Sequence, residues 1–276
     1  MKILLCLNRD IYCVAVLNLL CMGLKGHEVE ICFSDNVGKR PESVSLDKLL
    51  FYEKELPFDV IFPLLEANFR WKKSWRESGR FLTFNQINEI YSFSVLNFKN
   101  INSDGVKYLK NHPVDLIISI RFGQIFKQEI IDLPKFGIIN FHSGILPQFR
   151  GIMASFWAMF YGSEKIGGSL HFISDFGIDK GKIIDISYLE VQKQRSLIWH
   201  IFQLYYDGAK MILSVLEKFS AGEIVKAKDQ NENEAGYFGY PQQSDFLNFE
   251  NKYRLFDKDD YMEILKNWVY TKLKIS

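Results

Sequence analysis

Short apolar runs recur along the first half of this chain and alternate with stretches whose apolar residues follow a helical period. This alternation predicts parallel β-α-β units, with helices on both faces of one sheet. The run at residues 116–120 is apolar at almost every position, as expected of a central strand buried on both faces. The five predicted strands span residues 3–7, 29–33, 93–98, 116–120 and 137–141.

The second half of the chain has a different pattern. It predicts an apolar helix at residues 152–161, strands at 168–173 and 182–189, an amphipathic helix at 196–219 and a terminal helix at 259–272. We therefore expect an α/β fold with a doubly wound, mostly parallel, Rossmann-like sheet and a small C-terminal appendage. The core is predicted to span residues 1–205, and the helical and aromatic appendage residues 206–276.

The sequence does not decide the secondary structure of residues 53–78. Residues 59–63 are compatible with a further strand, and the basic and aromatic residues 69–76 fit either a helix face or a loop. We interpret the second run as scaffold rather than an RNA-binding surface, because Lys and Arg stems commonly cover apolar surface.

Composition and charge exclude several classes of protein. The 276 residues are 47% hydrophobic and 24% charged, which is typical of a globular protein. The net charge of +1 argues against a dedicated nucleic-acid binder. Residues 7–12, which follow the first strand, contain no glycine, so the chain lacks the G-x-G-x-x-G turn that NAD binding requires. The sequence also lacks the motifs of P-loop NTPases, zinc proteases and esterases.

The cysteines and the apolar runs predict a soluble, cytoplasmic protein. The N-terminal apolar stretch is divided by the polar residues 8–10, unlike a secretory signal, and no apolar run reaches the roughly 18 residues of a membrane span. We expect inert thiols, no metal site and no membrane partner. The four cysteines, which match no C-x-x-C pattern, are Cys6, Cys13, Cys21 and Cys32.

Candidate chemistry begins where the strand at residues 137–141 ends. Side chains alternate along a strand, so Asn140 and His142 project from the same face and Phe141 from the other. The carboxyl end of such a strand is where open α/β sheets place their ligand crevice. The alternative is that both polar residues only cap the strand end through backbone hydrogen bonds.

A second cluster follows the strand at residues 168–173. Asp179 lies in a glycine-bracketed turn, where an Asp is often no more than a turn former. If this loop faces the first, the Asp179 carboxylate would orient the His142 imidazole and raise its basicity. Asn, His and Asp together suit acyl transfer to an amine: donors stabilise the tetrahedral oxyanion, and His with Asp moves the proton without a covalent nucleophile.

Three blocks of this sequence, at residues 115–126, 137–151 and 175–181, resemble the folate-dependent formyltransferases in order and spacing. The family includes methionyl-tRNA, glycinamide ribonucleotide and nucleotide-sugar N-formyltransferases, and its catalytic Asn, His and Asp match Asn140, His142 and Asp179. The resemblance implies the co-substrate N10-formyltetrahydrofolate. The residues that it implies for folate are Phe122, Gly123, Gln124, Ile125 and Asp175, with a loop around Leu82 to Ile90.

Two positions depart from the family pattern. The family usually reads H-x-S-L-L-P, whereas Gly144 stands where the Ser is expected, which leaves any role of that hydroxyl in doubt. The tRNA enzymes typically place a Pro three residues after the Arg-Gly pair, but Ala154 follows Arg150 and Gly151 at that spacing. This difference disfavours tRNA as the acceptor.

The C-terminal sequence favours a small amine as the acceptor. Residues 241–276 carry six basic and six acidic side chains, which is unlike a clamp for a phosphate backbone. The resemblance favours a nucleotide-linked amino sugar used for surface polysaccharide, and a homodimer. Arg150 and Gly151 are expected to contact this substrate, with Tyr237, Phe238 and Tyr240 as a stacking platform for the base.

Several alternatives stay open from the sequence. The three aromatic residues could instead pack the final helix onto the core, and His171 fits a buried core imidazole better than a cleft residue. The acceptor could be methionyl-tRNA, and the fold could serve a non-catalytic folate-binding module. A trio of Asn140, His142 and Asp179 disfavours the last alternative, because a binding module has no need of it.

Overall fold

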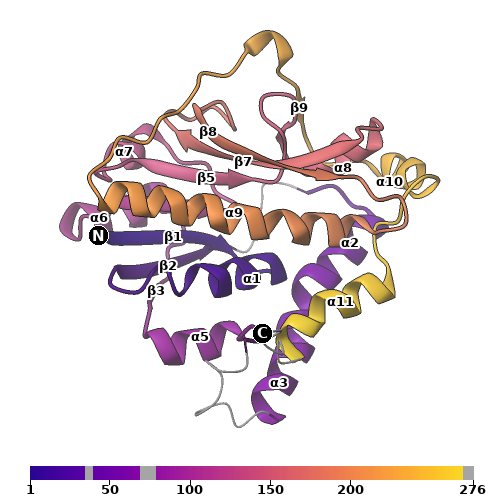
Figure 1. The fold of residues 1–276 in the computed structure, drawn as a ribbon, viewed down its shortest axis with the longest axis horizontal. Coiled ribbons are helices and arrows are strands. Elements are labelled where there is room, and N and C mark those ends of the chain that lie inside the picture. The colour runs from indigo at the N-terminus through magenta and orange to yellow at the C-terminus, as the bar shows by residue number, and fades with distance from the viewer. Residues whose placement is uncertain (35–39, 69–78, 270–276) are drawn as a thin grey trace, which may run out of the picture.

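A single sheet organises the computed structural model, which describes residues 1–34, 40–68 and 79–269 (Figure 1). Its strand order is β3-β2-β1-β4-β5-β7-β8. Neighbouring strands are parallel from β3 to β5, whereas β7 is antiparallel to β5 and to β8. The strands are β1 Lys2–Asn8, β2 Glu28–Ser34, β3 Ser94–Leu96, β4 Leu116–Ile120, β5 Ile138–His142, β7 Lys165–Ile173 and β8 Ile183–Glu190, with a separate pair β6 Arg150–Gly151 and β9 Tyr237–Phe238. The predicted doubly wound, mostly parallel α/β sheet is confirmed.

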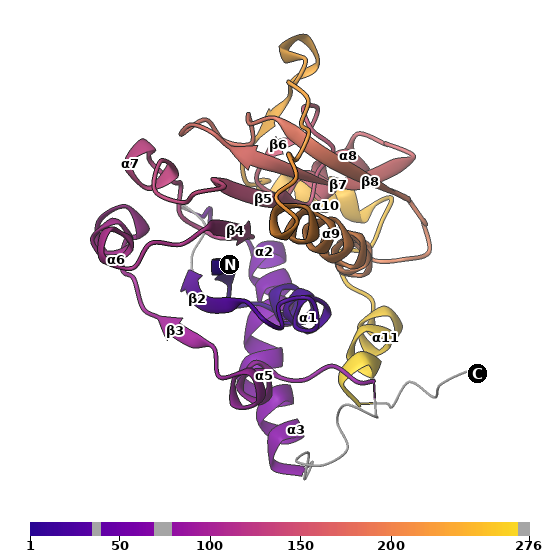
Figure 2. The ribbon, with the colours of Figure 1, turned by 60° about the vertical axis from the view of Figure 1, so that its left-hand side comes forward.

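Helices cover both faces of the sheet (Figure 2). Helices α1 and α9 lie on one face, and α6 and α7 lie on the other. The C-terminal helices form an appendage in which α11 contacts α9 and α10 contacts α2. The helices are α1 Ile11–Leu20, α2 Val44–Leu50, η1 Phe51–Ile61, α3 Phe62–Asn68, α5 Phe84–Tyr91, η2 Ile101–Gly105, α6 Val106–Asn111, α7 Gln128–Ile131, α8 Ala154–Phe160, α9 Leu197–Ser220, η3 Glu232–Glu234, α10 Gln243–Glu250 and α11 Lys258–Val269.

The alternation of side chains along the central strands separates two apolar cores. In β4, Ile118 and Ile120 belong to the larger core under α1 and α9, whereas Ile117 belongs to the smaller core under α6 and α7. Strand β5 follows the same rule, with Phe141 in the larger core and Ile138 in the smaller one. Asn140 and His142 therefore share the face of Ile138.

Two glycines hold the ring of Phe141 between the sheet and α9. A Cβ atom at Gly168 in β7 or at Gly208 in α9 would overlap this ring. The Tyr205 ring meets Phe141 edge-on at a centroid distance of 5.3 Å. The absence of side chains at both glycines thus lets α9 pack closely across β5 and β7.

One predicted strand is shorter in the structure, and the structure settles the open assignment of residues 59–63. The strand predicted at residues 93–98 shortens to Ser94–Leu96 at the sheet edge. Residues 59–63 form no strand but lie in the helical segment η1 and α3, because Phe58, Ile61, Phe62 and Leu65 recur at helical spacing and pack on the larger core. The terminal helix is described to Val269, and the run at residues 69–76 lies outside the described residues.

The remaining predicted elements match the structure closely. The helix predicted at 152–161 is α8, and the one at 196–219 is α9, whose first turn the Ser196 hydroxyl caps. A boundary after residue 205 falls inside α9, and the division into a core and an appendage stays a prediction. The four cysteine thiols are free and buried, and burial raises their pKa values. Among the described helices, none has the length and apolar character needed to cross a bilayer.

We expect Gly208→Ala to destabilise the protein. Its Cβ atom would lie 2.6 Å from Cζ of Phe141, a ring that Gly168 and Tyr205 already confine. Overpacking costs about 1–3 kcal/mol, which outweighs the roughly 1 kcal/mol that replacing a helical glycine gains. Urea unfolding monitored by circular dichroism measures the difference, and Glu217→Ala on the exposed side of α9 is the control. A Gly208→Ala variant more stable than the wild type would contradict this packing.

Candidate active site

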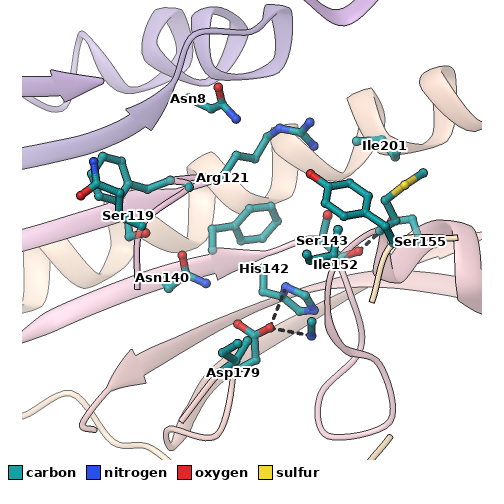
Figure 3. A pocket seen from close by; sticks show the side chains of 18 of the residues that line it. Asn8, Ser119, Arg121, Asn140, His142, Ser143, Ile152, Ser155, Asp179 and Ile201 are labelled. Carbon is teal, nitrogen blue, oxygen red and sulfur yellow. Dashed lines mark hydrogen bonds and ion pairs between the residues drawn. The ribbon is translucent and has the colours of Figure 1, made fainter. Parts of the chain in front are cut away.

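A cavity of about 660 Å³ lies beyond the carboxyl ends of the central strands (Figure 3). The chain runs outward from β1 to β2 and β3, then returns to place β4 on the other side of β1. Open α/β sheets bind ligands at this kind of switch point. The lining includes Asn8 at the end of β1, Ser119 and Arg121 at the end of β4, and Asn140 and His142 in β5.

Four polar side chains meet at the base of this cavity. The Asp179 carboxylate lies between two imidazoles, with Oδ2 3.5 Å from His142 Nδ1 and Oδ1 3.4 Å from His171 Nε2. Strand pairing sets His171 opposite Asn140, whose Nδ2 lies 3.1 Å from His171 Nε2. The structure thus brings together the three residues singled out by the sequence and adds His171.

Asp179 is held as an anion by its surroundings. Its side chain is 10% exposed, and burial alone would raise its pKa. The charge of His142, the hydrogen bond and charge of His171, and the Gly151 N–H outweigh this effect and hold the Asp179 pKa well below its usual range. The Gly151 N–H donates to Asp179 Oδ2 at 2.9 Å. With a φ of 55°, Asp179 also adopts a left-handed conformation that non-glycine residues rarely take.

Main-chain carbonyls orient the two imidazoles. His142 Nε2 lies 2.7 Å from the Phe149 carbonyl and His171 Nδ1 lies 2.9 Å from the Phe172 carbonyl, so each of these nitrogens must carry the hydrogen. His142 therefore presents Nδ1 to Asp179, as the nitrogen at which a proton is gained or lost. His171 presents Nε2 to Asn140 and Asp179, which fixes the Asn140 amide relative to the carboxylate.

Gly144 is required by the position of His142. A Cβ atom at residue 144 would lie 2.6 Å from His142 Nε2, 2.7 Å from the Phe149 carbonyl oxygen and 2.5 Å from the Cβ of Ala154. A serine at this position would displace the imidazole from its hydrogen bond with Phe149. The departure from the family pattern therefore fits the way in which this chain anchors its histidine.

Most residues that the resemblance implied for folate line the same cavity. Phe122, Gly123, Gln124 and Ile125 follow β4, and Asp175 lies in the loop after β7. Leu82 and Ile90 are not among the lining residues. Leu82 is 2% exposed, and its main chain bonds to the Asn18 side chain, while Ile90 lies on α5.

Gly151 and Tyr240 also line the cavity, whereas the other residues predicted for the acceptor do not. Arg150 is 3% exposed, and its guanidinium binds Gln230 and Glu232. Tyr237 is exposed in β9. Phe238 stacks on Phe149 and Trp157 at centroid distances of 5.6 and 5.4 Å, as expected of a packing residue.

The sequence analysis missed a buried ionic cluster around Arg121. The Arg121 Nε donates to Asp10 at 2.6 Å and its Nη2 to Glu53 at 2.9 Å, while the guanidinium lies over the Tyr12 ring. Burial raises the pKa of Glu53, an effect that Arg121 opposes. The available signal was a charged residue directly after a fully buried central strand. The Tyr205 hydroxyl is buried beside this cluster, and its burial raises its pKa, an effect that Arg121 opposes.

Residues 72–198 match the family model described as formyl transferase. The predicted resemblance to the formyltransferases is confirmed. The matched segment carries Asn140, His142 and Asp179, together with the loop at residues 122–125.

The curated proteins to which this chain is similar include methionyl-tRNA formyltransferases. The Clostridium beijerinckii protein is 35% identical over 129 residues, which are 47% of this chain and 42% of that protein. The Fusobacterium nucleatum protein is 31% identical over 187 residues, which are 68% of this chain and 58% of that protein. The chain thus spans about half the length of the curated relatives that it matches.

Solved formyltransferase structures share the fold at low sequence identity. An N-formyltransferase from Helicobacter canadensis, in complex with folinic acid and dTDP-3-aminofucose, aligns with a TM-score of 0.55 at 15% identity, over 98% of this chain and 81% of that chain. The phosphoribosylglycinamide formyltransferase from Anaplasma phagocytophilum also gives a TM-score of 0.55 at 15% identity, over 87% of this chain and 99% of that chain.

The low pKa of Asp179 predicts a specific pH dependence of stability. A carboxylate whose pKa is depressed by folding stabilises the native state above its unfolded pKa of about 4, and this stabilisation is lost as the pH falls below it. We therefore expect the stability difference between the wild type and Asp179→Asn to shrink from pH 6 to pH 3, as measured by urea unfolding.

Asp175→Asn, which removes an exposed carboxylate from the same loop, is the matched control for this series. The acid-side change should be larger for Asp179→Asn, because the Asp179 carboxylate faces two histidines. Parallel stability curves for the wild type and Asp179→Asn across this range would refute the assignment.

Proposed function

We propose that this chain transfers a formyl group from N10-formyltetrahydrofolate to the amino group of a nucleotide-linked amino sugar. The observation that carries the proposal is the cluster of Asn140, His142, His171 and an anionic Asp179 in one cavity. The match of residues 72–198 to formyl transferase supports the reaction class. The complex of the Helicobacter canadensis neighbour with folinic acid and dTDP-3-aminofucose supports the substrates.

The lining of the cavity fits a folate. Its volume of about 660 Å³ lies in the usual range for small-molecule sites. Phe122 and Phe126 stack at 5.5 Å and offer an apolar wall, while Gln124 and Asp175 offer polar groups in the lining. Folate supplies the activated formyl group that an amine attacks.

The residues at the base of the cavity stabilise charge and move protons. As the amine adds to the formyl carbon, negative charge collects on the formyl oxygen, and the amide of Asn140 is a donor for that oxyanion. The His142 imidazole, held by Phe149 and Asp179, accepts the proton that the adding amine loses and returns it to N10. The Asp179 carboxylate stabilises the imidazolium that results, because its pKa keeps it ionised at neutral pH. The bond between the formyl carbon and N10 breaks as the oxyanion collapses, and tetrahydrofolate leaves.

Methionyl-tRNA is the second candidate acceptor, and the curated relatives favour it. The balanced charge of residues 241–276 favours a small substrate instead. We extend the first proposal to a cytoplasmic homodimer that supplies formylated sugars for surface polysaccharide, such as the O-antigen of lipopolysaccharide.

Release of tetrahydrofolate, followed by absorbance, tests the reaction with dTDP- and GDP-linked 3-amino and 4-amino sugars and with methionyl-tRNA. We expect turnover with an amino sugar. We also expect His142→Ala and Asp179→Asn to lower kcat by about 10²–10⁴-fold, the usual contribution of acid–base catalysis.

His112→Ala is the matched control, because this exposed histidine lies outside the cavity beside Tyr108. Circular dichroism confirms that each variant is folded. If only methionyl-tRNA is formylated, the acceptor is the tRNA and not an amino sugar. Folded variants with wild-type turnover would remove the catalytic assignment.

A further inference from the structure

A second cavity, of about 850 Å³, lies at the same edge of the sheet. Its lining comes from the segments that follow β1 and β3, from the end of β2, and from helices α3 and α5. Gln124 lines both cavities. Of two consecutive residues, Asn8 lines the first cavity and Arg9 lines the second. The two cavities are therefore neighbours.

Aromatic side chains form the walls of the second cavity. Phe33 and Phe84 meet edge-on at a centroid distance of 4.8 Å, and Phe58, Phe62 and Phe98 also line the space. Ser34, Asn85 and Asn97 add hydrogen-bonding groups. Apolar rings with a few polar groups between them are suited to a flat heterocycle with polar edges.

Positive charge is in excess in the second cavity. Arg9 and Lys99 both line it, and neither forms an ion pair with a carboxylate in the described ranges. The Arg9 guanidinium instead lies 5.1 Å from the centre of the Phe58 ring. Glu66 is the acidic residue of the lining, and its two oxygens accept hydrogen bonds from Thr83 and Asn85.

The basic residues that line the first cavity already have polar partners. Arg121 is held there by two carboxylates, those of Asp10 and Glu53, and Lys54 donates to the Asn8 side chain. A diphosphate is attracted most by cations that have no carboxylate partner. The second cavity therefore suits a diphosphate better than the first.

We infer that the second cavity binds the nucleoside diphosphate part of the acceptor, with the base against the phenylalanine rings and the phosphates on Arg9 and Lys99. The inference rests on the proposed function, since the sugar amine must reach the cluster of Asn140, His142 and Asp179. Gln124 and the Asn8–Arg9 pair mark the passage from sugar to diphosphate.

Calorimetric titration of the full chain with dTDP, UDP and GDP, and separately with folinic acid, tests the inference. We expect Arg9→Ala and Lys99→Ala each to raise the Kd of the preferred nucleotide by tenfold or more, while the Kd of folinic acid stays within about twofold. The Kd should also rise with salt. Lys107→Ala, which removes an exposed cation on α6, is the matched control.

Kinetics give a second readout on the same variants. Loss of a diphosphate contact should raise KM for the nucleotide sugar and leave kcat within about threefold. Nucleotide affinity that is unchanged in Arg9→Ala and Lys99→Ala, or that is undetectable in the wild type, overturns the inference. A loss of folinic acid affinity in these variants also overturns it, since the cavity would then hold the glutamate tail of folate.

Failure of the proposed function gives a different result. In that case no amino sugar would be formylated, although dTDP would still bind in a manner that depends on Arg9 and Lys99. Formyl transfer to an amino sugar with wild-type KM in both variants would keep the function and remove the nucleotide site.

Discussion

The Asp179 carboxylate, held between two imidazoles, depends on the antiparallel pairing of β5 with β7. This pairing sets His171 opposite Asn140. The last residue of β7, Ile173, lies beside Ile138, the first residue of β5, whereas His142 is the last residue of β5. The loop that follows must therefore fold back over this face of the sheet for Asp179 to meet His142. The left-handed conformation of Asp179 and the Gly151 N–H hold the loop in that position. Removal of the carboxylate would leave His142 and His171 without their common partner, and Asn140 is held through His171.

The opposite face of the same strands provides the stability that this polar cluster does not. Phe141 projects away from the cluster and packs between Gly168, Gly208 and Tyr205, which fixes α9 across the sheet. Because the period of a strand is two, tight packing of Phe141 also fixes the direction of its neighbours Asn140 and His142. The same alternation puts one side of β5 in the apolar core and the other in the cavity.

The sequence predicted elements and motifs better than it predicted contacts between distant segments. The central strands and the helices α8 and α9 follow from periodicity, because burial on two faces requires long apolar runs. The proximity of Asp179 to His142 rested on a motif and not on periodicity, since it depends on how one loop folds back. Arg121, Asp10 and Glu53 went unnoticed, because their contacts join residues far apart in sequence. Arg150 matched a motif, but the structure pairs its guanidinium with Gln230 and Glu232, which lie about 80 residues later.

The charged residues of the two cavities indicate how an acceptor would lie across them, with its amine in the first cavity and its phosphates in the second. A partly buried guanidinium is costly to desolvate, and Arg121 is stabilised here by two carboxylates and the Tyr12 ring. Glu53 of this cluster lines the cavity at the switch point of the sheet, which also holds His142 and Asp179. A protonated amine is attracted by the Asp179 carboxylate, and the imidazole that this carboxylate orients can then accept its proton. Arg9 and Lys99 have no carboxylate partner in the described residues, although Arg9 lies over the Phe58 ring, and they suit the neighbouring cavity to the anionic end of the same molecule.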